Sequence, residues 1–282
     1  MPSNLSLSLV VCLLTLVTCT AFGSTLHAVE FAGLTPLYEV DQTTSALSIR
    51  GSNRTDGVGD LTSDPVNGIL WGIRIVPNQL IAFHPGTGAV AATTNLNSTD
   101  DITSIAFDPV TGILYGNTSV GFGAAADRLY RIDPTTGVTT QVGTIGFNNV
   151  YALGFSQTGR LFGISNDNLS LISIDTGSGA GTLIGATGLS LAFDLASRPE
   201  DDAMFVSDSL TNSLYTINTA TGATTSVGAS LIGPLGSSTN VAGLAFLLDT
   251  DGPGTSTPEP GTFALIGAGL FAVLAVRRRR AT

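Results

Sequence analysis

The sequence contains no lysine, and all eleven of its basic residues are arginines. Four of these arginines form one block near the C-terminus, so the stretch from Ser24 to Thr257 holds seven arginines against twenty aspartates and glutamates. A protein that binds nucleic acid needs a basic face that contacts phosphate groups. The acidic balance therefore excludes a nucleic-acid partner and favours a soluble surface.

Cysteine and histidine are scarce as well. The two cysteines, Cys12 and Cys19, lie in an apolar segment near the N-terminus, so the rest of the chain has neither a disulfide nor thiol chemistry. The two histidines are His27 and His84. So few histidines exclude a histidine-rich zinc site and leave little basis for a Ser-His-Asp triad. We therefore identify no catalytic residue in the sequence.

Residues 1–23 are typical of a secretory signal peptide, although the usual positive residues at its start are missing. Leu5 to Val17 forms the apolar core, and Ala21-Phe22-Gly23 has the small-x-small pattern of a cleavage site. Ala28 offers a second cleavage point. Leu16-Val17-Thr18-Cys19 is a poor lipoprotein signal, because threonine precedes the cysteine. We predict export, with cleavage after Gly23.

The C-terminal end combines three features in a fixed order. Pro258-Glu259-Pro260-Gly261-Thr262 comes first, an uncharged apolar run from Phe263 to Val276 follows, and Arg277-Arg278-Arg279-Arg280 closes the segment. The prolines mark the outer boundary of a helix. The apolar run has 14 residues, or roughly 21 Å of helix, which predicts a short transmembrane helix at 262–276. The arginines keep their end of that helix in the cytoplasm.

This tail, residues 258–282, resembles the PEP-CTERM sorting signal of Gram-negative bacteria. The resemblance implies that an exosortase, a membrane-embedded cysteine transpeptidase-like enzyme, recognises the chain. It further implies a precursor inserted in the inner membrane, removal of the tail, and delivery to the cell surface or the extracellular polysaccharide matrix. It implies nothing about the activity of the cargo. A plain C-terminal membrane anchor is the simpler alternative.

A repeated pattern fills the chain from Leu61 onward. Its units contain turns of the form Asp-Pro-x-Thr/Asn-Gly and segments of the form Leu-Tyr-x-Ile-Asp. Aspartate, proline and glycine each favour such a turn for a conformational reason. The glycines that mark successive units lie 49, 40 and 45 residues apart: Gly88, Gly137, Gly177 and Gly222. A period near 45 residues with several short strands per unit is typical of a β-propeller.

We predict an all-β fold, a five-bladed propeller over residues 30–249. The fifth unit begins at Leu244-Ala245-Phe246 and stops, while Leu37-Tyr38-Glu39-Val40-Asp41 matches the third strand of the other units. The N-terminal strands would therefore complete the last blade and leave no open edge. Six blades are the alternative if residues 54–60 or 231–241 hide further strands.

The repeats resemble those of secreted bacterial propellers, with NHL and Kelch-like proteins among the similar groups, and they match no single family closely. Residues 250–257 are rich in glycine, proline and threonine, which predicts a flexible linker to the tail.

Acidic residues gather in four places: Asp56 with Asp60; Asp100 with Asp101; Glu200, Asp201 and Asp202 with Asp208; and Asp249 with Asp251. Exported acidic loops can bind Ca²⁺ through carboxylate oxygens. None of the four has the spacing of a complete EF-hand loop, so we assign no metal ligand and interpret the groups as solvated loop charge.

Two further sets of residues recur through the repeats. Four aspartates are interpreted as turn and capping residues: Asp108, Asp133, Asp175 and Asp194. Three aromatic residues share one repeat position, which predicts core packing in preference to a ligand platform: Trp71, Tyr115 and Phe162.

The sequence therefore predicts an exported, non-enzymatic surface or matrix protein that presents loops to polysaccharide or to another surface protein. Ca²⁺ is the one cofactor that the acidic loops suggest. The alternative is a metal-dependent propeller hydrolase, such as a lactonase. That activity requires carboxylates that converge at the central channel.

Overall fold

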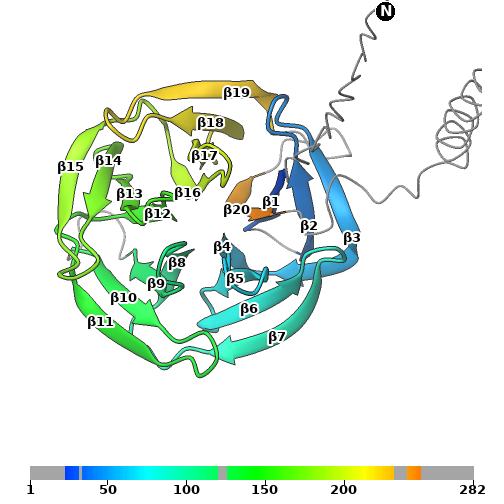
Figure 1. The fold of residues 1–282 in the computed structure, drawn as a ribbon, viewed down its shortest axis with the longest axis horizontal. Coiled ribbons are helices and arrows are strands. Elements are labelled where there is room, and N and C mark those ends of the chain that lie inside the picture. Colours follow the sequence, from blue (N-terminus) through cyan, green and yellow to red (C-terminus); the bar gives the residue numbers. More distant parts are fainter. Residues whose placement is uncertain (1–22, 32–33, 120–125, 232–239, 249–282) are drawn as a thin grey trace, which may run out of the picture. The chain divides into compact units, whose positions relative to one another are not determined.

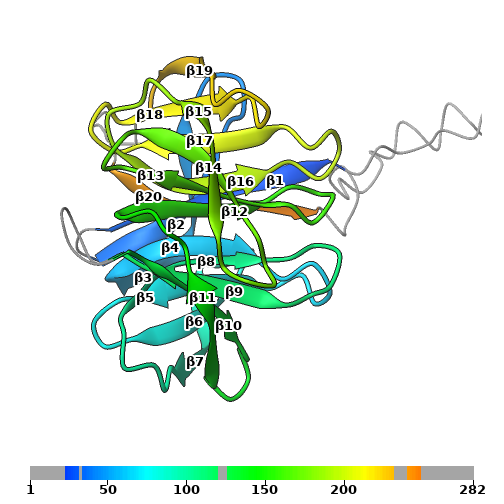
Figure 2. The same ribbon diagram turned by 90° about the vertical axis from the view of Figure 1, so that its left-hand side faces the viewer.

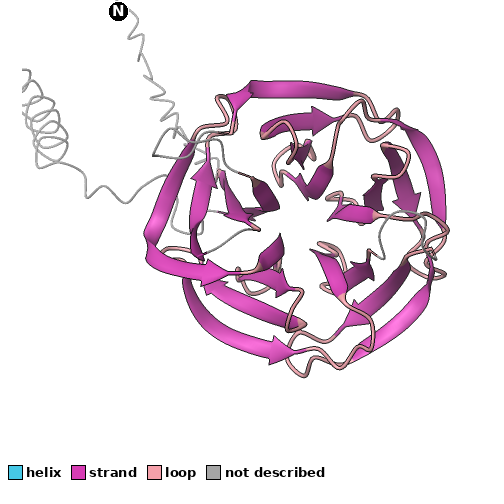
Figure 3. Cartoon of the chain, turned by 180° about the vertical axis from the view of Figure 1, so that it is seen from behind, coloured by secondary structure: helices cyan, strands magenta, loops and turns pink. Residues whose placement is uncertain are grey.

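The computed structural model describes residues 23–31, 34–119, 126–231 and 240–248, and this part of the chain forms five sheets of four strands each. The sheets stand around a central axis as the blades of a propeller (Figure 1). Viewed from behind, the described chain consists of strands and connecting loops (Figure 3). The prediction of an all-β, five-bladed propeller is confirmed, and the six-bladed alternative is wrong for the described residues. Residues 54–60 form the end of β3 and the start of β4, joined at Gly57, and of the other stretch considered, 231–241, residues 232–239 lie outside the described residues.

Each blade has four strands, which follow one another from the central axis to the outside of the ring. The innermost strands are β4 (Val58–Ser63), β8 (Ile102–Phe107), β12 (Val150–Phe155), β16 (Ala192–Ser197) and β20 (Val241–Leu248). The second strands are β5 (Leu70–Arg74), β9 (Leu114–Thr118), β13 (Leu161–Ser165), β17 (Met204–Asp208) and β1 (Ser24–Glu30). The third strands are β6 (Gln79–His84), β10 (Arg128–Ile132), β14 (Ser170–Ile174), β18 (Ser213–Ile217) and β2 (Leu34–Val40). The outermost strands are β7 (Ala89–Asn95), β11 (Thr139–Thr144), β15 (Gly181–Ala186), β19 (Thr224–Ser230) and β3 (Leu47–Asp56).

We number the blades 1 (β4–β7), 2 (β8–β11), 3 (β12–β15), 4 (β16–β19) and 5 (β20 with β1–β3). The core consists of hydrophobic clusters in the seams between neighbouring blades, and each of the five seams has its own cluster. Strands such as β8 are therefore buried along their whole length, which explains their nearly continuous apolar sequence. The outermost strands are largely exposed and rich in threonine and alanine, as in β7.

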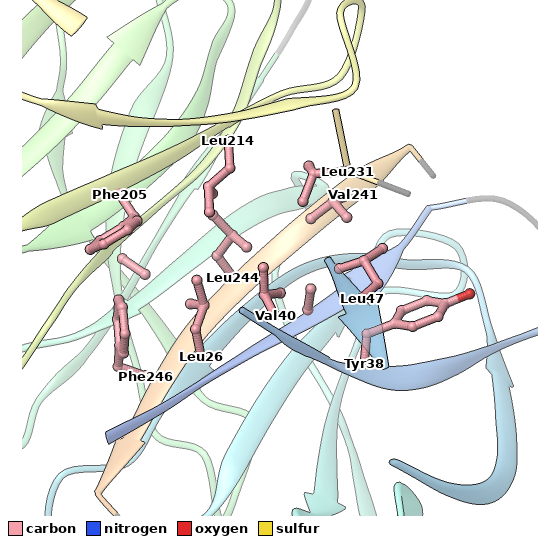
Figure 4. Packing of buried hydrophobic residues seen from close by; sticks show 12 residues of the cluster. Leu26, Tyr38, Val40, Leu47, Phe205, Leu214, Leu231, Val241, Leu244 and Phe246 are labelled. Atoms are coloured by element: carbon pink, nitrogen blue, oxygen red, sulfur yellow. The ribbon is translucent and has the colours of Figure 1, made fainter. Parts of the chain in front are cut away.

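Blade 5 closes the ring by joining the two ends of the described chain. β20 forms its innermost strand and pairs with β1, from Ser24 opposite Leu248 to Glu30 opposite Val241. The seam between blades 4 and 5 buries side chains from both ends of the sequence, with Leu26 and Leu244 facing Phe205 of β17 (Figure 4). The predicted role of the N-terminal strands is confirmed in this respect.

The closing blade also takes in a strand that lies before the expected start of the propeller at residue 30. β1 begins at Ser24, and Leu26, His27 and Ala28 within it are at most 2% exposed. Cleavage after Ala28 would remove these buried residues from the ring. A start at Ser24 agrees with cleavage after Gly23, so the geometry favours that one of the two cleavage points.

The strands run between two faces that carry the connections, as the side view shows (Figure 2). One face carries the tight turns between innermost and second strands, at residues 64–69, 108–113, 156–160 and 198–203. In blade 5 the paired ends Ser24 and Leu248 stand where this turn would be, so we call this the terminus face. The opposite face carries the connections between blades, at residues 96–101, 145–149 and 187–191, and we call it the loop face.

The turns behave as the repeated aspartates predict. The Asp108 carboxylate accepts hydrogen bonds from the Val110 N–H (2.9 Å) and the Thr111 hydroxyl (2.6 Å), and Gly112 closes the turn at φ 69°. Asp133 and Asp175 make equivalent bonds to the backbone two and three residues ahead. Their interpretation as turn residues is confirmed.

Candidate functional site

The sorting-signal residues that the sequence singled out, Pro258, Glu259, Pro260, Gly261 and Arg277–Arg280, lie outside the described residues, as do the linker at 250–257 and the transmembrane helix at 262–276. Among the residues that the structure does describe, no helix is long and apolar enough to span a membrane. The last described strand, β20, ends at Leu248 on the terminus face.

A polar network surrounds this point and fastens blade 5 to blade 4. The Ser24 hydroxyl donates to the Glu200 carboxylate (2.8 Å), and the Gln42 amide donates to the Ser24 carbonyl (2.9 Å). Arg198 donates to the Gln42 side chain (2.9 Å) and to both carboxylate oxygens of Asp201 (2.8 and 2.6 Å). The Arg198 guanidinium holds the pKa of Asp201 below its ordinary value. These acidic residues therefore serve as structural acceptors.

Acidic residues in the other groups are structural hydrogen-bond acceptors as well. Asp100 accepts hydrogen bonds from Arg128 (2.6 Å) and from the Tyr130 hydroxyl, which lower its pKa. The Asp208 carboxylate, 1% exposed, accepts bonds from the backbone N–H groups of residues 190, 191, 210 and 211. Asp249 and Asp251 lie outside the described residues. Within the described ranges, no three histidine, cysteine, aspartate or glutamate side chains are grouped so that they could hold a metal ion.

Asp60 and Asp194 differ from the other acidic residues that the structure describes, because they meet inside the ring. Asp60 lies on β4 and Asp194 on β16, and both side chains are 0% exposed. The interpretation of Asp194 as a turn residue is wrong. It assumed that Phe193-Asp194 matches Phe107-Asp108, whereas the strand register places Arg198 at the turn position of blade 4. Asp60, which the sequence suggested as loop charge, is equally buried.

The two carboxyl groups hydrogen-bond to each other and to backbone N–H groups. Asp60 accepts from the N–H of Leu61 (2.8 Å) in its own strand and of Ile105 (2.7 Å) in blade 2. Asp194 accepts from the N–H of Leu195 (2.6 Å) in its own strand and of Leu244 (2.5 Å) in blade 5. The pair therefore links blades 1, 2, 4 and 5.

Burial raises the pKa of both groups. Removal from water, together with the adjacent Asp194 carboxyl, raises the pKa of Asp60 well above its ordinary value. Burial raises the pKa of Asp194 to about 7, against the opposing effect of its hydrogen bonds. Two carboxylates in contact cannot both be ionised without water or a cation between them. The pair therefore carries a proton at neutral pH.

The repeat explains why these two residues meet. In each innermost strand the pairing with the second strand skips one residue at the same point, a β-bulge. The residues that follow the five bulges are Asp60, Ser104, Ala152, Asp194 and Gly243. Blade 5 stands between blades 4 and 1, and its residue is glycine. A Cβ at Gly243 would lie 2.8 Å from the Asp60 carbonyl carbon, so the missing side chain lets β20 pack closely against the backbone of β4 between blades 4 and 1.

The bulged residues themselves include an aromatic pair. They are Gly59, Thr103, Tyr151, Phe193 and Ala242. Tyr151 and Phe193 lie on neighbouring innermost strands near the loop face, with ring centroids 5.4 Å apart and planes tilted by 40°. Both are partly exposed, whereas Thr103 and Ala242 are buried. Bulges re-aim side chains next to binding sites in many sheets, and no sequence feature had marked these two residues.

The aromatic residues that the sequence did mark are core residues. Trp71, Tyr115 and Phe162 are at most 9% exposed and belong to three different seam clusters. The register adds Phe205 and His27 at the same position of blades 4 and 5. Core packing is therefore confirmed for this position, and His27 is its one member with a basic side chain.

The comparisons with known proteins concern the tail and the ring separately. A family model described as the PEP-CTERM protein-sorting motif matches residues 256–280. The chain carries a PEP-CTERM sorting motif. It is therefore an exported protein handled by an exosortase, of a kind typical of Gram-negative bacteria. No curated protein matches the sequence.

Solved structures resemble the ring. A chain in the crystal structure of a nidogen/laminin complex has a TM-score of 0.54 at 12% identity, with 80% of this chain and 99% of that chain covered. Kuenenia stuttgartiensis hydrazine synthase gives 0.43 at 14% identity, covering 60% and 47%. A structural genomics protein of unknown function from Bacteroides thetaiotaomicron gives 0.44 at 13% identity, covering 70% and 49%. The first likeness supports the fold alone.

Proposed function

We propose that this PEP-CTERM protein is a non-enzymatic binding or structural component of the cell surface or extracellular matrix. Its propeller is exported, its tail is processed by exosortase, and its loop face contacts polysaccharide. One observation carries the proposal: the sorting motif at 256–280 follows a closed ring whose first and last strands end together, Ser24 opposite Leu248.

The loop face lies at the opposite ends of the strands from the terminus face, on which the first and last described strands end together, Ser24 opposite Leu248. It contains the connections between blades, of which residues 96–101 include the polar run Asn97-Ser98-Thr99. Loops on a rigid scaffold are where binding residues are found most often.

The Tyr151–Phe193 pair is the part of this face that best fits a sugar ring. Aromatic side chains offer a large flat area that loses little conformational entropy on binding. The nearest members of the bulged set are small, with Ala242 beside Phe193 in the next blade and Thr103 beside Tyr151. A neutral pyranose that stacks on the two rings is the ligand contact we propose.

The burial of the carboxyl pair supports a non-enzymatic function over the hydrolase alternative. A general acid or base must come within hydrogen-bond reach of its substrate. Asp60 and Asp194 are the carboxyl groups that converge near the axis, yet both are 0% exposed and engaged with backbone N–H groups. They hold the ring together and present no oxygen to a bound molecule.

Cell fractionation and intact mass test the sorting part. Wild type should yield a product that begins at Ser24, ends near Pro258–Pro260, and is found at the surface or in the medium. Deletion of Arg277–Arg280 should leave an unprocessed chain in the inner membrane, whereas replacement of the four arginines by lysine keeps the charge and should allow processing. A wild-type chain that retains its tail would contradict the proposal.

Affinity electrophoresis in gels of the producing cell's polysaccharide tests the ligand contact. Replacing both Tyr151 and Phe193 by alanine should abolish the retardation. Val76→Ala is the matched control, because Val76 is 80% exposed on the same face but distant in sequence from both rings. Equal retardation of wild type and both variants would refute the proposed aromatic contact. Metal-dependent turnover of esters, lactones or glycans by the purified protein would overturn the non-enzymatic function.

A further inference from the structure

The contacts of Asp60 and Asp194 cross two seams of the ring and connect the two blades on either side of blade 5. The bond from Asp60 to Ile105 crosses from blade 1 to blade 2, and the bond from Asp194 to Leu244 crosses from blade 4 to blade 5. The bond between the two carboxyl groups passes Gly243 and connects blade 4 to blade 1 across the closing strand. Closure at β20 is therefore secured by these bonds as well as by apolar packing.

Equivalent positions in the other blades make weaker links or none. Ser104 donates a hydrogen bond to the Tyr151 carbonyl of blade 3. Ala152 has no polar atom in its side chain. The two seams that the aspartates bridge are thus the one between blades 4 and 5, beside the blade that holds both described chain ends, and the one between blades 1 and 2.

The charge state of the pair decides whether these bonds hold. A carboxyl–carboxylate pair shares a proton and attracts, whereas two carboxylates at this separation repel each other in a medium that screens poorly. The ionisable residues on the strands packed around the pair are few: His27 and Glu30 on β1, Arg74 on β5, Tyr151 on β12 and Asp208 on β17. The carboxyl groups contact only each other and backbone N–H groups, so no cation compensates a second negative charge.

We propose that the Asp60–Asp194 pair is a proton-dependent clasp that secures ring closure while it holds a proton and weakens it when the proton is lost. Because its folded-state pKa values are raised, the contribution of the clasp is complete below the unfolded carboxyl pKa near 4. It is lost as pH rises through the folded values, of which that of Asp194 is about 7. This inference does not depend on the proposed surface function.

Urea unfolding of the full-length chain in mild detergent tests the clasp, with the fluorescence of Trp71 as the reporter in the seam between blades 1 and 2. The folding constant should fall by up to about tenfold per pH unit for each proton that the folded state holds in excess of the unfolded chain. Asp60→Asn and Asp194→Asn each replace the shared proton by an amide N–H. At least one of the two should fold, and between pH 7 and pH 9, where His27 is neutral in both states, its folding constant should change at least tenfold less than that of wild type.

Asp208→Asn is the matched control, since Asp208 is equally buried and bound to backbone N–H groups but has no carboxyl partner. It should keep the pH dependence of wild type. The proposal is overturned if both amide variants fold and retain the wild-type dependence. If neither variant folds, a solvent-isotope and ¹³C-carboxyl NMR titration of wild type decides. A carboxyl resonance that titrates above pH 6 supports the clasp, and full ionisation of both groups by pH 5 refutes it.

Discussion

His27→Phe should stabilise the propeller in acid and change little at pH 7.5. His27 occupies the position at which the other blades place Trp71, Tyr115, Phe162 and Phe205. Its Nδ1–H donates to the Thr25 carbonyl (3.2 Å), and its Nε2, among the described residues, is buried without a partner. Burial, followed by the nearby Arg50 charge, lowers its pKa from 6.5 to about 4.

The size of the effect follows from the two pKa values. Above pH 6.5 the imidazole is neutral in both states and costs nothing. Below pH 6.5 the unfolded chain binds a proton that the folded chain refuses, so stability is lost as pH falls towards 4. With the values of 6.5 and about 4, the loss is about 2 kcal/mol at pH 5. Phenylalanine does not titrate. Below pH 6.5 it also avoids the repulsion between a protonated His27 and the Arg50 guanidinium, and its ring attracts a cation.

The assay is urea unfolding of wild type and His27→Phe at pH 5 and pH 7.5. The stability difference between the two proteins should grow by about 2 kcal/mol at the lower pH. Any constant cost, such as the lost bond to Thr25, cancels in this comparison. His27→Gln keeps a polar group without titration and should show the same pH-dependent gain. A difference that is the same at both pH values would refute the reasoning.

Three further predictions concern packing and charge. Gly243→Ala should lower the free energy of unfolding by more than the usual overpacking cost of about 1–3 kcal/mol, because the new Cβ would lie 2.6 Å from the Leu61 backbone nitrogen. Gly86→Ala is the control in the same urea titration. It should be nearly neutral, because its Cβ meets only the His84 ring at 3.6 Å. The rings of Phe205 and Phe246 lie 5.3 Å apart across the closing seam, so a double-mutant cycle with alanine should give a coupling of about 0.5–1.5 kcal/mol, and a coupling near zero would show that the contact is not made. The hydroxyl and backbone bonds of residue 178 lower the pKa of Asp175, so its contribution is present above the ordinary carboxyl pKa and lost as pH falls. Asp175→Ala should therefore lower the thermal midpoint at pH 7 and have less effect at pH 3.

Much of this molecule can be derived from its local sequence. The turn at Asp108–Gly112 needs an aspartate that bonds the backbone ahead of it and a glycine at positive φ, and these requirements involve neighbours only. The spacing of such turns gave the number of blades, and the match of Leu37–Asp41 to a third strand revealed the closing blade. The sorting motif is also a linear signal, since a chain of three ordered features can be recognised without a fold.

The buried carboxyl pair could not be found in this way. Asp60 and Asp194 are 134 positions apart, and their contact depends on the closure of five blades and on a glycine in the blade between them. The sequence even suggested the wrong role for Asp194, because Phe193-Asp194 reads like the strand end Phe107-Asp108. A bulge shifts the register of the innermost strand, and only the pairing with β17 reveals the shift.

The sequence by itself thus determined the number of blades, the turn chemistry and the export signals, because each of these depends on residues close together in the chain. Only the tertiary structure determined that the first strand begins at Ser24 and that two carboxyl groups with raised pKa values lie inside the ring. β1 has no alternating pattern of its own and becomes a strand through its pairing with β20. Folding removes water from both carboxyl groups and so raises both pKa values, and the adjacent Asp194 carboxyl raises that of Asp60 further.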